Sequence, residues 1–297
     1  MHDPSAPTGS TEPAGGPAAS AVPRALTIAG SDSGGGAGIQ ADLKTFAALG
    51  VWGMSAITSI TVQNTLGVSG VADVAADVVG AQIRVVATDI GVDAAKTGML
   101  SSTPIVEAVA IAVAECGIPN LVVDPVFVSK HGHRLLREDA VEALRALMLP
   151  LATLVTPNLP EAEGLAGFEV TSRERMQDAA SAILDLGAKA VLVKGGHLAG
   201  DRADDLFADR DGSDWIRAER IDTPNTHGTG CVLSAAIAGH LAAGEDLVGA
   251  VRKGKAFVTE AIRHSLAIGR GIGPVDPGWA IGATGVSAGP DAARGRP

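Results

Sequence analysis

Residues 25–38 read ALTIAGSDSGGGAG, a short apolar run that leads directly into a glycine-rich loop. The run Leu26–Ala29 predicts a buried strand, and the segment Gly38–Leu49 after the loop predicts a helix. A strand, a loop and a helix in this order are typical of the first unit of an open parallel sheet. At the carboxyl edge of such a sheet, glycines let the backbone approach a ligand closely, although the same loop is also compatible with a simple tight turn.

The rest of the chain body repeats this alternation of short apolar runs and longer segments of helical period. The pattern predicts an α/β fold with a doubly wound, mostly parallel sheet, helices on both faces and the site at the carboxyl ends of the strands. Residues 201–219 are more charged and predict a hairpin or edge strands. Further strands are expected at 55–62, 94–97, 121–124, 153–156 and 191–194, and helices at 75–87, 103–116, 138–149, 173–186, 228–243 and 247–265.

We expect one domain over residues 24–281, between two tails. Residues 1–23 and 282–297 are rich in Ala, Pro, Gly, Ser and Thr, and such segments cannot bury enough apolar surface to offset their ordering entropy. Both tails are therefore predicted to be disordered.

Composition excludes several classes of function. The 23 Lys and Arg face 33 Asp and Glu, a formal net charge of −10, which disfavours nucleic acid and anionic membranes as partners. No apolar stretch is long enough to span a bilayer. Two cysteines are too few for a disulfide framework and no leader is evident at the N-terminus, so we expect a cytoplasmic protein.

A second glycine motif, NTHGTGC at residues 225–231, precedes a predicted helix of small residues. The free N–H groups and the dipole at such a helix start make it a ready phosphate site. The same field is expected to favour the thiolate of Cys231, which makes it a candidate base or nucleophile; the alternative is a buried structural cysteine. Metal ligation by His227 and Cys231 is disfavoured, because no second pair at zinc spacing exists.

A third motif, TPNLPEAE at residues 156–163, marks the end of a strand and the start of a helix. Pro160 and the early acids are ordinary helix-start chemistry, while Asn158 and Glu161 are also suited to a hydrated Mg²⁺ beside phosphate oxygens. Lys96 and Lys194 lie at expected strand ends, where a lysine either neutralises phosphate or is simply solvated. The loop at residues 129–134, with His131 and His133, is interpreted as a flexible polar flap.

Taken together, these segments resemble the bacterial hydroxymethylpyrimidine/phosphomethylpyrimidine kinases of the ribokinase-like superfamily. The resemblance covers nearly all of residues 25–275. It rests on residues 25–32 (ALTIAGSD), 35–42 (GGAGIQAD), 63–65 (QNT), 96–100 (KTGML), 124–126 (DPV), 156–162 (TPNLPEA), 194–197 (KGGH) and 225–231 (NTHGTGC).

The resemblance implies ATP-dependent phosphorylation of 4-amino-5-hydroxymethyl-2-methylpyrimidine and then of its monophosphate, with Mg²⁺, in a homodimer. An aspartate stands at the place of Cys231 in most sugar kinases of the superfamily, and cysteine there marks the pyrimidine kinase branch. The implied site residues are Gly228, Thr229, Gly230 and Cys231 for the anion hole and catalysis; Gly30, Ala37, Asp42, Gln63, Met99 and Val126 for the pyrimidine; Lys194, Asn158 and Thr226 for ATP; and Glu161 and Asp124 for the metal ion.

Two other functions stay open at this point. A pyridoxal kinase of the same branch acts on a flat heteroaromatic ring that also carries a hydroxymethyl group. A non-catalytic nucleotide-binding regulator is disfavoured by the intact loop Gly228–Cys231 and by Asn158 and Glu161.

Overall fold

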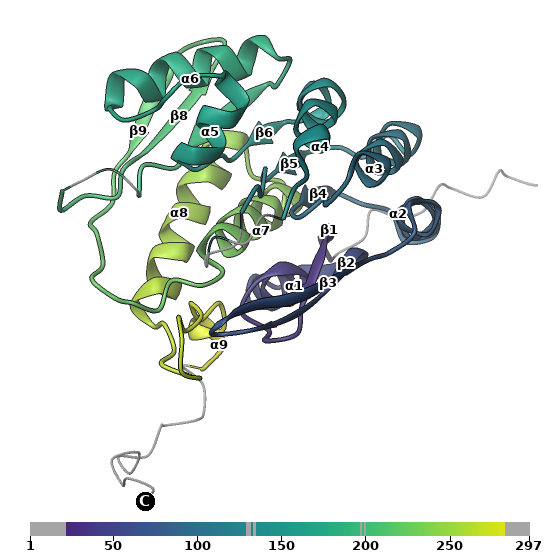
Figure 1. Ribbon diagram of the computed structural model, residues 1–297, viewed down its shortest axis with the longest axis horizontal. Coiled ribbons are helices and arrows are strands. Elements are labelled where there is room, and N and C mark those ends of the chain that lie inside the picture. Colours follow the sequence, from purple (N-terminus) through teal and green to yellow (C-terminus); the bar gives the residue numbers. More distant parts are fainter. Residues whose placement is uncertain (1–21, 129–131, 133–134, 197, 199, 283–297) are drawn as a thin grey trace, which may run out of the picture.

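The computed structural model describes residues 22–128, 132, 135–196, 198 and 200–282 (Figure 1). The disordered tails predicted at the two ends therefore lie almost entirely outside the described residues, and so does the flap around His131 and His133. Those predictions remain predictions. Among the described residues, no helix is long and apolar enough to cross a membrane.

One nine-stranded sheet runs through the described residues in the order β3-β2-β1-β4-β5-β6-β7-β8-β9. The central strands from β2 to β7 pair in parallel, whereas β3 at one edge and β8 and β9 at the other are antiparallel. The predicted mostly parallel sheet is thus confirmed. The strands are β1 (Arg24–Asp32), β2 (Trp52–Asn64), β3 (Gly67–Asp73), β4 (Ala94–Thr97), β5 (Leu121–Val123), β6 (Leu154–Val155), β7 (Ala190–Val193), β8 (Asp205–Asp209) and β9 (Ser213–Ile216).

Helices cover both faces of the sheet, as predicted (Figure 1). Alternate strand residues point to opposite faces, so Leu121 and Val123 of β5 join one apolar core while Val122 joins the other. The first core is covered by α2 (Ala76–Asp89), α3 (Thr103–Glu115), α4 (Glu138–Ala143), α5 (Leu159–Ala166) and α6 (Arg173–Asp185), and the second by α1 (Gly38–Ala48), α7 (Thr229–Ala242) and α8 (Leu247–Arg263); a short α9 (Trp279–Gly282) follows.

Two local predictions need correction. The single helix expected at 138–149 ends as an α-helix at Ala143 and continues as a π-helical turn, Leu144–Met148, and a 3₁₀ turn, Leu149–Leu151. Pro150 lacks the N–H that a continued α-helix needs. Strand β3 was not predicted, because its glycines and exposed residues give no apolar run. The hairpin expected within 201–219 is confirmed as β8 and β9.

The direction in which the chain winds reverses at β1, which lies between β2 and β4. Helix α1 connects β1 to β2 over one face, and α2 leads from β3 to β4 over the other. Ligands of open parallel sheets bind outside the carboxyl ends of the strands at such a reversal. The fold therefore places a site beyond Asp32, Thr97 and Val123, where β1, β4 and β5 end.

The crossing of α7 and α8 depends on a glycine. A Cβ on Gly254 would lie 2.6 Å from Cγ1 and 3.2 Å from the backbone nitrogen of Ile237, so the helices approach more closely than a side chain allows. We predict that Gly254→Ala destabilises the protein by about 1–3 kcal/mol, although alanine favours a helix by about 1 kcal/mol.

Gly80→Ala in α2 is the matched control, because its new Cβ would meet mainly the end of the flexible Arg84 side chain. Chemical denaturation of both variants checks the prediction. A Gly254→Ala protein as stable as Gly80→Ala would contradict it.

Candidate active site

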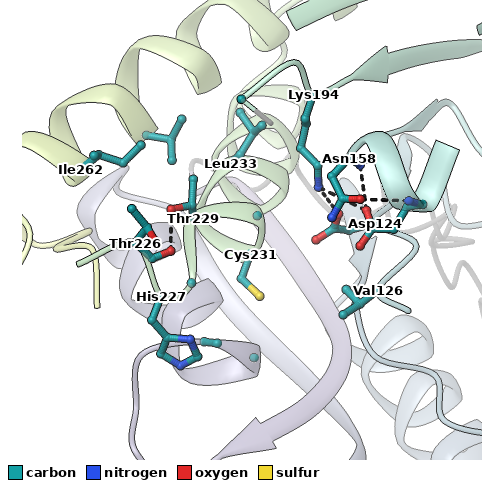
Figure 2. Close-up of a pocket in the computed structure, with 18 of the residues that line it drawn as sticks. Asp124, Val126, Asn158, Lys194, Thr226, His227, Thr229, Cys231, Leu233 and Ile262 are labelled. Atoms are coloured by element: carbon teal, nitrogen blue, oxygen red, sulfur yellow. Dashed lines mark hydrogen bonds and ion pairs between the residues drawn. The ribbon is translucent and has the colours of Figure 1, made fainter. Parts of the chain in front are cut away.

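A cavity of about 830 Å³ opens at the carboxyl ends of the parallel strands. Strand β1 contributes Gly30, the end of β2 contributes Gln63, and β5 leads to Asp124. The first turn of α7 faces the same space, as Figure 2 shows. One cavity thus brings together nearly all the residues that the sequence marked: Gly30, Ala37, Gln63, Met99, Asp124, Val126, Asn158, Glu161, Lys194, Thr226, Gly228, Thr229, Gly230 and Cys231.

The start of α7 is held against the glycine loop by Gly228. Its φ is +82°, and a Cβ there would lie 1.9 Å from the carbonyl oxygen of Gly36, so glycine is required. Thr229 donates its hydroxyl to the Thr226 carbonyl at 2.8 Å, which fixes the turn before the helix. The amides of the first helical turn have no acceptor four residues back and carry the positive end of the helix dipole. The geometry is suited to an anion.

A buried cluster of charges lies beside this turn. Lys194 Nζ is 2.9 Å from Asp124 Oδ1 and 3.7 Å from Glu161 Oε2. Burial opposes every charge here, but Asp124 and Glu161 raise the pKa of Lys194, and Lys194 lowers that of Asp124. A Cβ on Gly230 would lie 3.5 Å from both Asp124 Oδ2 and Lys194 Nζ, so the cluster adjoins the anion site.

Glu161 is a helix-capping residue whose carboxyl also faces the cavity. It forms a capping box with Asn158: Asn158 Oδ1 accepts from the Glu161 amide at 2.9 Å, and Glu161 Oε2 accepts from the Asn158 amide at 2.8 Å. The helix-start interpretation is therefore confirmed. The Glu161 carboxyl nevertheless lines the cavity, and burial together with the nearby Asp124 raises its pKa to about 7, against the attraction of Lys194.

Cys231 occupies the centre of the site, with its sulfur directed into the cavity (Figure 2). The predicted lowering of its pKa is wrong for the ligand-free protein. Desolvation of the sulfur is the main cause that raises the pKa of the thiol to about 11. Lys96 and the hydrogen bond from the Gly38 amide lower the pKa, but the nearby Asp42 and Asp124 raise it further, so the compensation is only partial. The helix field alone does not outweigh burial among carboxylates.

Asp42, predicted to line the pyrimidine pocket, does not do so. It is fully buried, accepts a hydrogen bond from Thr27 Oγ1 at 2.6 Å and lies 3.1 Å from Lys96 Nζ. This face of α1 packs on the sheet, so the carboxyl compensates the buried ammonium group and is not available to a ligand. Lys96 lies in β4, within the strand expected at 94–97, with part of its side chain in the cavity wall.

Sequence reasoning missed the role of Asp32 and His227. The Asp32 carboxylate accepts from the amides of Gly34, Gly36 and Ala37 at 2.8, 3.1 and 2.9 Å, and lies 2.9 Å from His227 Nε2. Burial opposes its ionisation, but the His227 and amide hydrogen bonds prevail and lower the pKa of Asp32. An aspartate two residues before glycines is a known turn signal, so this loop role was detectable. The contact with His227, 195 residues away, was not.

The described residues contain no cluster of three or more His, Cys, Asp or Glu side chains arranged to hold a metal ion. A magnesium ion at Asp124 and Glu161 would depend on further oxygens from a ligand, as is common for Mg²⁺.

The fold and the site together define a kinase of the ribokinase-like type that acts on a small molecule. The family model described as phosphomethylpyrimidine kinase matches residues 32–276, and the chain belongs to this family.

Individual relatives agree. The hydroxymethylpyrimidine/phosphomethylpyrimidine kinase of Streptomyces coelicolor is 53% identical over 260 residues, covering 88% of this chain and 96% of the relative. The ADP complex of Bacillus subtilis pyridoxal kinase is similar with a TM-score of 0.82 and 41% identity, over 87% of this chain and 98% of that one. For the phosphomethylpyrimidine kinase of Clostridium difficile, the TM-score is 0.72 and the identity 44%, over 80% and 99%.

The buried carboxyl of Glu161 makes stability depend on pH. Its pKa rises from an ordinary 4.5 to about 7 on folding, so its favourable contribution is complete below pH 4.5 and is lost as pH rises through 7. That difference corresponds to about 3 kcal/mol. We predict that Glu161→Gln, which keeps a cap acceptor, becomes more stable relative to the natural protein by roughly this amount between pH 4.5 and 8.

Denaturation at several pH values measures this difference. Glu163→Gln, on the same helix but outside the cavity, is the control and should show no comparable pH trend. A Glu161→Gln curve parallel to that of the natural protein would refute the assignment.

Proposed function

We propose that this kinase transfers the γ-phosphoryl group of ATP to the hydroxymethyl group of 4-amino-5-hydroxymethyl-2-methylpyrimidine, and then a second phosphoryl group to the resulting monophosphate. The observation that carries the proposal is the shared cavity. Gln63 and Met99 line the same cavity as the start of α7 and Lys194. An acceptor ring and a phosphate chain can therefore meet in front of Cys231.

The nucleotide occupies the end of the cavity toward α8 in this proposal. Lys194, Asn158 and Thr226 are the polar groups assigned to ATP, and Val258 and Ile262 supply apolar surface for its base. The ADP complex of the Bacillus subtilis pyridoxal kinase supports a nucleotide site in a similar fold.

Phosphoryl transfer of this kind needs mainly alignment and compensation of charge, because the transition state spreads negative charge over the transferred oxygens. The α7 amides and the Lys194 ammonium supply positive potential at the place where the β- and γ-phosphates would lie. Cys231 Sγ takes the proton of the attacking hydroxyl in this proposal. The oxygen then forms the new P–O bond as the bond to ADP breaks.

The residues of the site fit a magnesium ion. In the Asp124–Glu161–Lys194 cluster one cation faces two carboxylates, and burial, with a smaller contribution from Asp124, raises the pKa of Glu161. Carboxylate oxygens together with phosphate oxygens are the ligands Mg²⁺ prefers. Asp124 and Glu161 would hold the ion, which when bound neutralises phosphate charge. The proposal also includes a homodimer, which the resemblance implies, and the cytoplasmic location expected from the sequence.

Pyridoxal is the second candidate substrate. The observation in its favour is the pyridoxal kinase of Bacillus subtilis, which is similar over 98% of its length with a TM-score of 0.82. The two substrates share a hydroxymethyl group on a flat heteroaromatic ring and differ at the ring edge. Discrimination between them depends on Gln63 and its neighbours, since a mispaired polar edge costs about 1–3 kcal/mol.

We predict that the purified protein with ATP and Mg²⁺ phosphorylates the pyrimidine alcohol and its monophosphate, and that removal of divalent ions by EDTA abolishes turnover. ADP release, with the phosphorylated products identified by mass spectrometry, measures each step. The same assay with pyridoxal gives the ratio of the two kcat/KM values. Turnover of pyridoxal alone would overturn the primary proposal and support the second one.

A further prediction concerns Cys231 as the base. With a thiol pKa of about 11, only about one molecule in ten thousand carries a thiolate at pH 7, so kcat should rise with pH above 7. Cys231→Ala keeps the helix amide but removes the base, and should lower kcat roughly 100- to 10,000-fold with KM for ATP little changed. Cys231→Asp should retain activity. Its kcat should rise less steeply with pH above 7, because a carboxyl ionises at lower pH than a thiol.

Steady-state kinetics of the three proteins between pH 6 and 9 provide the test. Cys116→Ala, at the far end of α3, is the control for loss of a thiol as such. Near-normal turnover by Cys231→Ala would show that the site works without this base.

A further inference from the structure

The hydrogen bonds around Gln63 determine which of its polar atoms can bind the acceptor ring. Gln63 Oε1 lies 3.1 Å from Thr61 Oγ1, and Gln63 Nε2 lies 3.3 Å from His227 Nε2. Each end of the carboxamide therefore faces one polar side chain. The carboxamide oxygen only accepts hydrogen bonds and the nitrogen only donates them. The orientation of the carboxamide between Thr61 and His227 therefore decides which groups Gln63 presents to a ligand.

The state of His227 Nε2 follows from Asp32. The Asp32 carboxylate is ionised, already accepts from three backbone amides, and lies 2.9 Å from His227 Nε2. A carboxylate at that distance requires a donor, so His227 Nε2 carries a hydrogen. An N–H of Gln63 facing this nitrogen would then place two donors against each other.

Thr61 gives an independent constraint at the other end of the carboxamide. Its Oγ1 is 2.9 Å from the carbonyl oxygen of Ser31, which can only accept. The single hydroxyl hydrogen is therefore used on Ser31, and the lone pairs of Thr61 Oγ1 require a donor from Gln63. An oxygen of Gln63 at this position would leave two acceptors facing each other.

Both mismatches disappear when the carboxamide is turned by 180°. The oxygen then faces the N–H of His227 Nε2, whose single hydrogen it shares with Asp32 at the longer distance of 3.3 Å, and the nitrogen donates one hydrogen to Thr61 Oγ1. The two ends are similar in size, so no other atom has to move. Two constraints from different parts of the chain select the same orientation.

We propose that His227, held by Asp32, is a positioning residue that fixes the orientation of the Gln63 carboxamide toward the acceptor substrate. In this orientation the second N–H of Gln63 and the remaining lone pair of its oxygen are available to a ligand. Together they match a ring nitrogen beside an amino group, the edge of an aminopyrimidine. His227 thereby becomes a determinant of specificity without touching the ring.

The ring of His227 is well placed for this role. His227 is only 6% exposed, and a Cβ on Gly36 would lie 2.5 Å from its Cδ2, so the glycine loop packs tightly against it. Its backbone is also fixed, because its N–H donates to Gly273 and its carbonyl accepts from Val275. A rigid donor is what holds a carboxamide in one orientation.

A double-mutant cycle tests the inference, which rests on the proposed function. His227→Phe should raise KM for the pyrimidine alcohol about tenfold or more and leave KM for ATP within about twofold. In a Gln63→Ala background, His227→Phe should have little further effect on the pyrimidine KM, because the group it positions is gone. Lys44→Gln is the control, since Lys44 binds the same loop through the Gly35 carbonyl but does not contact Gln63.

Additive effects in the cycle, or equal increases in both KM values, would overturn the inference and leave His227 as a packing residue. If His227→Phe fails to fold, side-chain ¹⁵N NMR of the natural protein decides: Nε2 of His227 is expected to carry the hydrogen, and an unprotonated Nε2 overturns the inference. If the natural protein does not phosphorylate the pyrimidine at all, it is the proposed function that fails, and the NMR result still stands for the orientation of Gln63.

Discussion

A close contact between two glycines helps to join the two halves of the site. Gly228 lies so close to the carbonyl oxygen of Gly36 that no Cβ fits between them, which brings the start of α7 onto the loop that follows β1. The loop belongs to the beginning of the fold and α7 to its end, nearly 200 residues later. Without this approach, the loop after β1 and the first turn of α7 would be separate surfaces of the fold and would not line one cavity.

Burial of charge is the second organising feature. Lys96 and Asp42 are both fully buried and compensate each other beneath the cavity, while Lys194 lies between Asp124 and Glu161. Buried charges of this kind are costly unless they are paired, and they are frequent at functional sites. Burial raises the pKa of the Cys231 thiol to about 11, and the nearby Asp42 and Asp124 add to this rise, so the thiol is protonated at neutral pH in the ligand-free protein.

Much of the fold was accessible from the sequence because apolar runs and glycine turns report local structure directly. The central strand Ala94–Thr97 was predicted with its observed bounds. Strand β3 was not predicted, because its largely exposed residues show no hydrophobic periodicity. In the site, motifs located the residues at strand ends, but they could not tell which way a helix face turns. Asp42 was therefore assigned to the cavity, although α1 directs it into the interior. Contacts between residues far apart in the sequence, such as Asp32 with His227, produce no local sequence pattern from which they could be predicted.

The residues assigned to the ring and those assigned to phosphate belong to different segments of the chain, and this separation has an evolutionary consequence. Gln63 and Met99, which we assign to the ring, are carried by segments at or beyond β2 and β4, whereas Asp124, Lys194 and the α7 turn are carried by others. Under the proposed function, changes in the first set would alter which ring is accepted and would leave the residues assigned to phosphate intact. A scaffold partitioned in this way would allow a gene copy to diverge in substrate through a few exchanges, without first losing catalysis.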